Sequence, residues 1–188
     1  MFQDEAARRI GTTESTVANW ESGRSIPCLR AWPGVLIFLG YDPRPAAKTI
    51  GEKFGLHREG LGISKEELAE KLDLDPGTVK AWERWADKRQ NHRSIPTIAR
   101  FIGSNPFDHP ASDAERVRQW RLLLGLTQRQ LGKELGVREA VVLDWERGRR
   151  NVPNEIVVKL KKSLADSPHW QCSRFARHSQ TNFRSIQL

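Results

Sequence analysis

Apolar residues recur in steps of three and four along most of the chain, which is the spacing of an amphipathic helix. The clearest stretch has apolar side chains at Val117, Trp120, Leu124, Leu131 and Leu135. Strict alternation of apolar and polar residues, which would predict strands, is almost absent. The pattern therefore predicts an all-α fold.

The helical pattern occurs three times. A Trp-Glu pair stands at residues 20–21, 82–83 and 145–146, at intervals of 62 and 63 residues. A second motif, Pro-x-(Val or Ile)-x-x-Phe-x-Gly, occupies residues 33–40 and returns at 96–103. So many coincidences at one register predict tandem repeats of a single helical unit.

Each repeat carries signals for two short helices joined by a tight turn. Ser64 with Glu67, and Thr127 with Gln130, form capping boxes that begin a helix. A small residue in the first helix would let the second helix cross closely, and the turn position suits a left-handed backbone. These positions are Ala7, Ala69 and Gly132 in the helix, and Gly11, Asp73 and Gly136 in the turn. Two short helices with this close crossing form a helix-turn-helix.

The third repeat resembles the Cro/repressor-type (XRE-like) helix-turn-helix family of bacteria and their phages. The resemblance lies in Thr127-Gln128-x-x-Leu131-Gly132-x-x-Leu135-Gly136-Val137, followed by Val142-x-x-Trp145-Glu146-x-Gly148-Arg149. Residues 64–83 and 3–24 resemble the same family. The resemblance implies tandem small helical bundles of the lambda-repressor-like helix-turn-helix type.

Four segments follow from this division. We expect a first repeat at 1–43 that lacks its first helix, a second at 48–108, a third and most complete one at 112–165, and a flexible basic tail at 166–188. The first helix is expected to be absent because Met1 falls one residue before the next helix of that repeat begins. The second repeat departs from the pattern by glycines in its first helix and a longer segment at 85–93.

Charge favours a polyanionic partner. The 188 residues carry a formal net charge of +8, with a sequence pI near 9.9. The excess is largest in residues 109–165, where 12 bases and seven acids give +5. No apolar run is long enough to cross a bilayer and two cysteines cannot form a disulfide framework, so we expect a cytoplasmic, nucleoid-associated bacterial protein.

Outward-facing side chains at the start of the second motif helix are the expected base-reading residues, because this end of the helix enters the major groove. Asn can pair with adenine, Arg with guanine, and Glu can accept from cytosine. A glutamine beginning the preceding helix and arginines following the recognition helix are expected to hold phosphates. The DNA-binding candidates are Gln3, Thr13, Glu14, Ser15, Asn19, Lys80, Gln128, Arg138, Glu139, Ala140, Asp144, Arg147, Arg149 and Arg150.

Some of these residues have a second interpretation. The arginines at 147, 149 and 150 could equally be a solvated helix end whose cations suit the helix dipole. Asp144 and Glu139 would repel phosphate. The tryptophans at 20, 82 and 145 are expected to anchor the core. The family resemblance also implies partly buried structural ion pairs, Arg58–Glu83 and Arg121–Glu146.

These observations predict a sequence-specific DNA-binding transcriptional regulator, with repression as the expected mode. The alternative is a protein-interaction or assembly module whose repeats have partly lost DNA contact. An enzyme is not expected, because no catalytic set or phosphate-binding loop is present. We expect double-stranded DNA as the partner. No cofactor, membrane or small-molecule substrate is expected. No metal is expected either, since His169, Cys172 and His178 supply too few ligands. The sequence leaves the oligomeric state open and is compatible with a homodimer.

Overall fold

The computed structural model describes residues 2–85 and 91–166, and every regular element in these ranges is helical. The all-α prediction is therefore confirmed. The chain divides into two compact units with a boundary between residues 86 and 87. This boundary lies inside the expected second repeat, 48–108, so the division into repeats stays a prediction.

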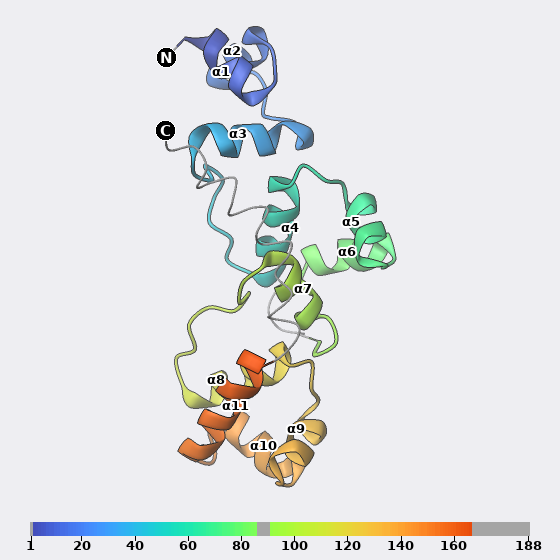
Figure 1. The fold of residues 1–188 in the computed structure, drawn as a ribbon, viewed down its shortest axis with the longest axis vertical. Coiled ribbons are helices and arrows are strands. Elements are labelled where there is room, and N and C mark those ends of the chain that lie inside the picture. The colour runs from blue at the N-terminus through green and yellow to red at the C-terminus, as the bar shows by residue number, and fades with distance from the viewer. Residues whose placement is uncertain (1, 86–90, 167–188) are drawn as a thin grey trace. The chain divides into compact units, whose positions relative to one another are not determined.

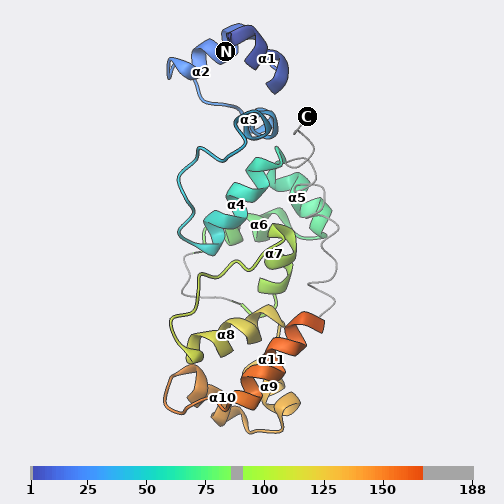
Figure 2. The same ribbon diagram turned by 60° about the vertical axis from the view of Figure 1, so that its left-hand side comes forward.

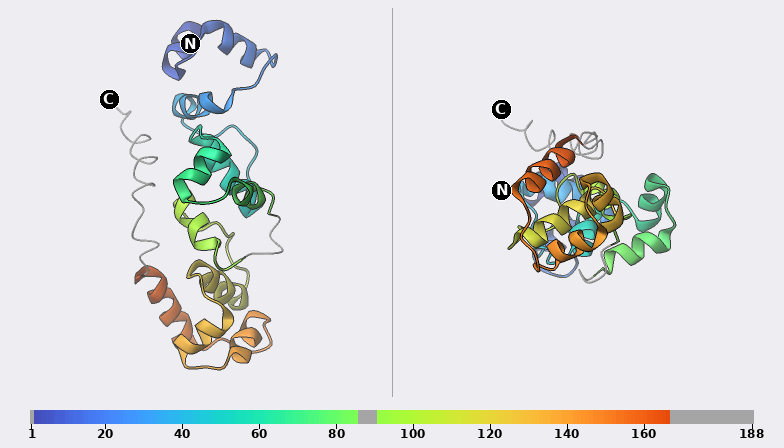
Figure 3. Two further views of the ribbon diagram at one scale, coloured as in Figure 1. Left: turned by 90° about the vertical axis from the view of Figure 1, so that its right-hand side faces the viewer. Right: turned by 90° about the horizontal axis from the view of Figure 1, so that it is seen from below.

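The first unit holds seven of the described elements (Figure 1). They are α1 (Gln3–Ile10), α2 (Glu14–Glu21), the short 3₁₀ helix η1 (Leu29–Ala31), α3 (Trp32–Leu39), α4 (Ile50–Gly60), α5 (Lys65–Leu72) and α6 (Pro76–Glu83). α1 packs on α2 and α3, and α4 packs on α3 and α6. Figure 3 shows α1 and α2, in blue, as a helix pair joined by a short turn.

The second unit contains α7 (Ile95–Ile102), α8 (Asp113–Leu123), α9 (Gln128–Leu135), α10 (Glu139–Glu146) and α11 (Asn154–Asp166). α9 packs on α10, while α8 packs on both α10 and α11 (Figure 2). The core of this bundle consists of Val117, Leu131, Val142, Trp145 and Leu160. Each of α8, α9, α10 and α11 thus contributes to one apolar cluster.

Side-chain caps begin several helices, among them the two whose capping boxes the sequence predicts. The capping boxes of Ser64 and Thr127 begin α5 and α9, and Thr13 and Asp75 cap α2 and α6. A further capping box at Thr49 begins α4. These caps satisfy backbone N–H groups that have no partner inside the helix.

The turns within the three helix pairs use a left-handed residue. Gly11 and Gly136 have φ of 83° and 73°, and the same conformation is forced on Asp73, with φ of 54°. Glycine enters this region without steric cost, whereas a residue with a Cβ is strained there. Asp73 is the one described non-glycine residue with positive φ.

One glycine of α4, Gly51, has a packing reason that the sequence did not reveal. A Cβ on Gly51 would lie 2.6 Å from the carbonyl oxygen of Trp82 and 2.8 Å from that of Glu83. One on Gly55 would lie 3.5 Å from the Glu83 side chain, an ordinary contact. Gly51 therefore lets α4 approach the C-terminal end of α6, at a cost in helix propensity.

Arg44 fastens the proline-containing segment between α3 and α4. Its guanidinium pairs with Asp42 at 2.6 Å, donates to the carbonyl oxygen of Leu56, and lies 4.8 Å from the ring centroid of Trp32. The hydrogen bond from Arg44 lowers the pKa of Asp42 below its ordinary value. The segment is thus tied to α4 by side chains as well as stiffened by prolines.

None of the helices in the described ranges is long and apolar enough to cross a membrane. Most of the expected tail at 166–188, and the metal-like residues within it, lie outside the described residues, as does part of 85–93.

Candidate nucleic-acid interface

The α9–α10 pair presents one buried and one exposed face. Val142 and Trp145 of α10 lie in the core. Gly132 of α9 lies so close to the following turn that a Cβ would be 2.7 Å from the carbonyl oxygen of Val137. Because the core side of α10 is fixed in this way, its opposite side and its N-terminal end are left to solvent.

The residues expected to contact bases lie at that exposed end. Arg138, Glu139 and Ala140 are exposed, whereas Asp144 and Leu143 are half-buried. The arginines expected to contact phosphates, at 147, 149 and 150, follow α10 and are also exposed. The structure thus brings the candidates of the third repeat together around one helix.

The N-terminal end of α10 has no side-chain cap. Arg138 precedes the helix in an extended conformation and accepts no cap hydrogen bond through its side chain. At the equivalent ends of α2 and α6, the Thr13 hydroxyl and the Asp75 carboxylate accept from a backbone N–H group. An uncapped N-terminus leaves N–H donors and the positive end of the helix dipole for an external anion.

The arginines near α10 form no salt bridges with the acidic residues that the structure describes. Neither Arg138 nor the three arginines at 147, 149 and 150 form a salt bridge with any residue that the structure describes. Arg129, in the first turn of α9, is likewise exposed and unpaired among those residues. The sequence analysis missed Arg129, although its position beside Gln128 was the available signal.

A buried ion pair fixes the C-terminal end of α10. Arg121 Nε donates to Glu146 Oε1 at 2.5 Å and Nη2 donates to Oε2 at 3.0 Å. Arg121 Nη1 also donates to the carbonyl oxygen of Leu126, so α8, α10 and the start of α9 are held together. The side chain of Glu146 is 6% exposed.

The corresponding pair in the first unit shares the Nε and Nη1 bonds, but Arg58 Nη2 donates to Glu59 instead of to the second oxygen of Glu83. Arg58 Nε donates to Glu83 Oε1 at 2.5 Å, and Nη1 donates to the carbonyl oxygen of Ile63 at 2.8 Å. Glu83 is 12% exposed and Arg58 is 4% exposed. Both arginine–glutamate pairs expected from the family resemblance are therefore in contact.

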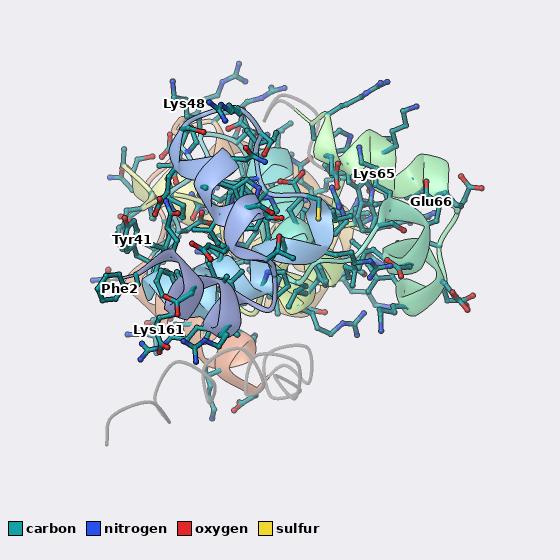
Figure 4. The ribbon with its side chains drawn as sticks, turned by 90° about the horizontal axis from the view of Figure 1, so that it is seen from above. Phe2, Tyr41, Lys48, Lys65, Glu66 and Lys161 are labelled. Atoms are coloured by element: carbon teal, nitrogen blue, oxygen red, sulfur yellow. The ribbon has the colours of Figure 1, made fainter. Side chains whose placement is uncertain are left out.

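The glutamines expected to hold phosphate each contact a glutamate of their own helix pair, and their phosphate role stays a prediction. Gln128 Nε2 donates to Glu146 Oε2 at 2.7 Å, and Gln3 Nε2 donates to Glu21 Oε2 at the same distance. In the α5–α6 pair Lys65 takes this place, with Nζ 2.8 Å from Glu83 Oε2; Figure 4 labels Lys65 at the start of α5. The first residue of each preceding helix thus contacts the glutamate that follows the tryptophan, a relation that the alignment of repeats could have revealed.

Candidates in the first unit are less well placed for an anion. The Thr13 hydroxyl caps α2 and bonds the hydroxyl groups of Ser15 and Thr16. Glu14 and Ser15 are exposed, and Asn19 is half-buried. On α6, Lys80 is exposed but Asp75 occupies the helix N-terminus. The carboxylate that caps α6 occupies its N–H donors and would repel phosphate, whereas the N-terminus of α10 keeps free N–H donors although Glu139 lies in its first turn.

Comparison with known proteins supports the family for the second unit. Residues 117–165, about a quarter of the chain, match the helix-turn-helix family model. This segment begins within α8 and ends within α11. No curated protein and no solved structure matches the chain. The match supports a helix-turn-helix domain at α8–α11, the class of domain that serves DNA-binding transcription regulators.

Among the described residues, no group of three or more His, Cys, Asp or Glu side chains could hold a metal ion.

Proposed function

We propose that this protein is a sequence-specific transcriptional regulator that binds double-stranded DNA through α10 of its second unit and represses by occupying its site. The observation that carries the proposal is the uncapped N-terminus of α10 among exposed arginines that form no salt bridge with a residue the structure describes. The helix-turn-helix match over the same helices supports it. The proposed activity is binding, without catalysis or cofactor.

In the proposed complex, the first turn of α10 enters the major groove. Arg138 is suited to the N7 and O6 acceptors of guanine, and Glu139 can accept from the amino group of cytosine. The free N–H groups of the helix and the arginines at 149 and 150 would contact phosphates. Asp144 is half-buried, and its carboxylate would repel a phosphate placed beside it.

The Arg121–Glu146 pair would position this surface rather than contact DNA. It ties α8 to the end of α10, and Gln128 joins the same carboxylate from the start of α9. A helix pair held rigidly pays less conformational entropy on binding than a mobile one. We therefore assign Arg121, Glu146 and Gln128 to preorganisation of the interface.

We also infer that the chain is built from three tandem helix-turn-helix repeats. The pairs α1–α2, α5–α6 and α9–α10 consist of eight-residue helices in each case. The same internal contact to the glutamate recurs in all three, through Gln3, Lys65 and Gln128. On this inference only the third repeat keeps a surface suited to DNA.

The test is selection of binding sites from a random duplex pool with the intact chain. We expect enrichment of a defined sequence, and an affinity that falls steeply with salt because phosphate contacts release counterions. A folded chain that enriches no sequence, or that fails to bind any duplex at low salt, would refute the proposal. An operator placed before a reporter gene would then distinguish repression from activation.

The alternative, a protein-interaction module, is favoured for the first unit by its exposed apolar residues. Exposed large apolar side chains there include Phe2, Ile37, Leu39 and Tyr41, whereas none lies on α10. An apolar surface of this kind is typical of a protein contact rather than of a DNA contact. The two activities can coexist, one in each unit.

A further inference from the structure

The repeated proline of the second sequence motif makes the same contact in both units. In the first unit Pro33, the second residue of α3, lies against Gly62, where a Cβ would come within 2.9 Å of its Cγ atom. In the second unit Pro96, the second residue of α7, lies against Gly125, where the corresponding distance is 3.1 Å. The two glycines have φ of 68° and 72° and stand in the turns before α5 and α9. The same contact therefore places α3 beside the start of α5 and α7 beside the start of α9.

An arginine three residues before the proline belongs to this contact. Arg30 Nη1 donates to the carbonyl oxygen of Gly62 at 3.0 Å, and Nη2 donates to Glu67 Oε1 at 2.5 Å. Glu67 lies in the first turn of α5. Arg93 has the corresponding position in the second unit, 63 residues later in the chain. An arginine at this position can thus reach the first turn of the helix that follows the glycine.

The carboxylate that pairs with this arginine in the first unit has no counterpart in the second. Gln130 stands where the first unit has Glu67, and its amide oxygen accepts from the backbone N–H of Thr127. Arg93 is exposed, and its side chain forms no hydrogen bond or salt bridge with any residue in the described ranges. The guanidinium of Arg93 is therefore uncompensated among these residues.

The first turns of the two helices also carry opposite charge. At the start of α5, residues 65–67 comprise one base and two acids, a net charge of −1. At the start of α9, residues 128–130 contain Arg129 and two glutamines, a net charge of +1. Arg129 is exposed and forms no salt bridge with a described residue. Two unpaired arginines, at 93 and 129, thus come from either side of the turn before α9.

The start of α9 adjoins the proposed DNA-binding surface. Gln128 Nε2 donates to Glu146 Oε2 at 2.7 Å, so the first residue of α9 meets the last residue of α10. The exposed arginines at 147, 149 and 150 follow that end of α10. The two arginines beside the start of α9 therefore extend a surface that is already basic.

We propose that Arg93, together with Arg129, binds a phosphate of the DNA backbone. This inference rests on the proposed function of α10, and it extends the DNA contact to a residue outside the 117–165 segment that matches the family model. Guanidinium groups suit phosphate because their N–H donors match the geometry of its oxygens. The contact of Pro96 with Gly125 holds the backbone near Arg93 in place before DNA binds. Phosphate contacts position a protein on the duplex without reading its sequence, so this contact adds affinity rather than specificity.

The test measures the affinity of the full chain for its selected duplex and for an unrelated duplex across a range of salt concentrations. Arg93→Gln should weaken binding to both duplexes alike and reduce the slope of log affinity against log salt by about 1. Arg93→Lys should keep the slope, because an ammonium group still neutralises a phosphate. Arg100→Gln is the matched control, since Arg100 is exposed in the last turn of α7, and it should leave the slope unchanged.

A second variant restores the acidic partner of the first unit. Gln130→Glu should pair with Arg93 as Glu67 pairs with Arg30, and so reduce the slope by about 1. Adding Arg93→Gln to Gln130→Glu should then change the slope little, because the phosphate contact is already lost. Strictly additive effects of the two substitutions would contradict the shared site.

The outcomes separate this inference from the proposed function. A wild-type chain that binds its duplex, with an unchanged slope in Arg93→Gln, would overturn the inference and leave the proposed function standing. A lowered melting temperature of Arg93→Gln with an unchanged slope would overturn it too, since the residue would then be structural. A folded wild-type chain that binds neither duplex at low salt would refute the proposed function, and the inference with it.

Discussion

Replacing Arg121 by Met tests whether the buried ion pair holds the helix-turn-helix of the second unit together. The substitution removes two hydrogen bonds to Glu146 and one to the carbonyl oxygen of Leu126, while the shorter, unbranched apolar side chain of methionine retains part of the packing volume. Glu146 keeps the bond from Gln128 but loses its charge partner at 6% exposure. Breaking a buried pair costs about 3–5 kcal/mol, and the remaining Gln128 bond places the expected loss near ~3 kcal/mol.

Native-state hydrogen exchange of the α10 amides measures this loss without interference from the first unit. A loss of about 3 kcal/mol corresponds to roughly a hundredfold faster exchange of the most protected amides. Arg116→Met is the control, because the Arg116–Asp113 pair lies on the same helix and both side chains are exposed. It should change stability by less than about 1 kcal/mol.

The double variant Arg121→Met with Glu146→Leu completes the cycle. The double variant should lose less stability than the sum of the losses of the two single variants, because no uncompensated charge remains. An Arg121→Met effect no larger than that of Arg116→Met, or strictly additive single effects, would contradict the role assigned to this pair.

Three further predictions concern the first unit, each followed by hydrogen exchange or thermal unfolding. Asp73→Gly should stabilise it by about 0.5–1 kcal/mol, because glycine relieves the strain of a left-handed residue; no change, or a loss, would contradict this. Gly51→Ala should destabilise the first unit by about 1–2 kcal/mol, since the new Cβ would meet backbone oxygens that cannot move aside. Gly55→Ala on the same helix should instead stabilise it by up to about 1 kcal/mol, because alanine has the higher helix propensity. Because Arg44 lowers the pKa of Asp42, this carboxylate stabilises the folded state above its ordinary pKa of 3.8 and loses that effect as the pH falls through its folded-state pKa. Asp42→Asn should therefore weaken the dependence of stability on pH in this acid range, and an unchanged profile would argue against the contact.

Much of the fold could be predicted from local chemistry. Capping boxes and left-handed turn positions act over a few residues, so Ser64, Thr127 and Gly136 could be assigned from sequence alone. The ion pair Arg121–Glu146 came from the family resemblance, because contacts between residues far apart in sequence leave no local signal.

Other features depended on packing. From composition alone, Gly51 is only an unfavourable helix residue. Its role follows from the close approach of α4 to α6. The contact of Gln128 with Glu146 depends on where the end of α10 lies relative to the start of α9. By contrast, the difference between the uncapped α10 and the capped α6 could have been predicted from sequence, because Arg138 has no acceptor where the equivalent Asp75 has a carboxylate.

The central claim is that α10 of the second unit binds DNA. The most direct measurement is the affinity of the intact chain for its selected duplex across a range of salt concentrations. Arg149→Ala with Arg150→Ala should lower affinity for all duplexes and reduce the salt slope by about 2, while Arg138→Ala should cost about 1–3 kcal/mol on the selected sequence and relax its specificity. The matched control removes Lys161 and Lys162, two exposed lysines on α11, outside the α9–α10 pair. The account predicts that this control retains affinity and specificity; equal losses in all three variants, or no loss in any, would contradict it.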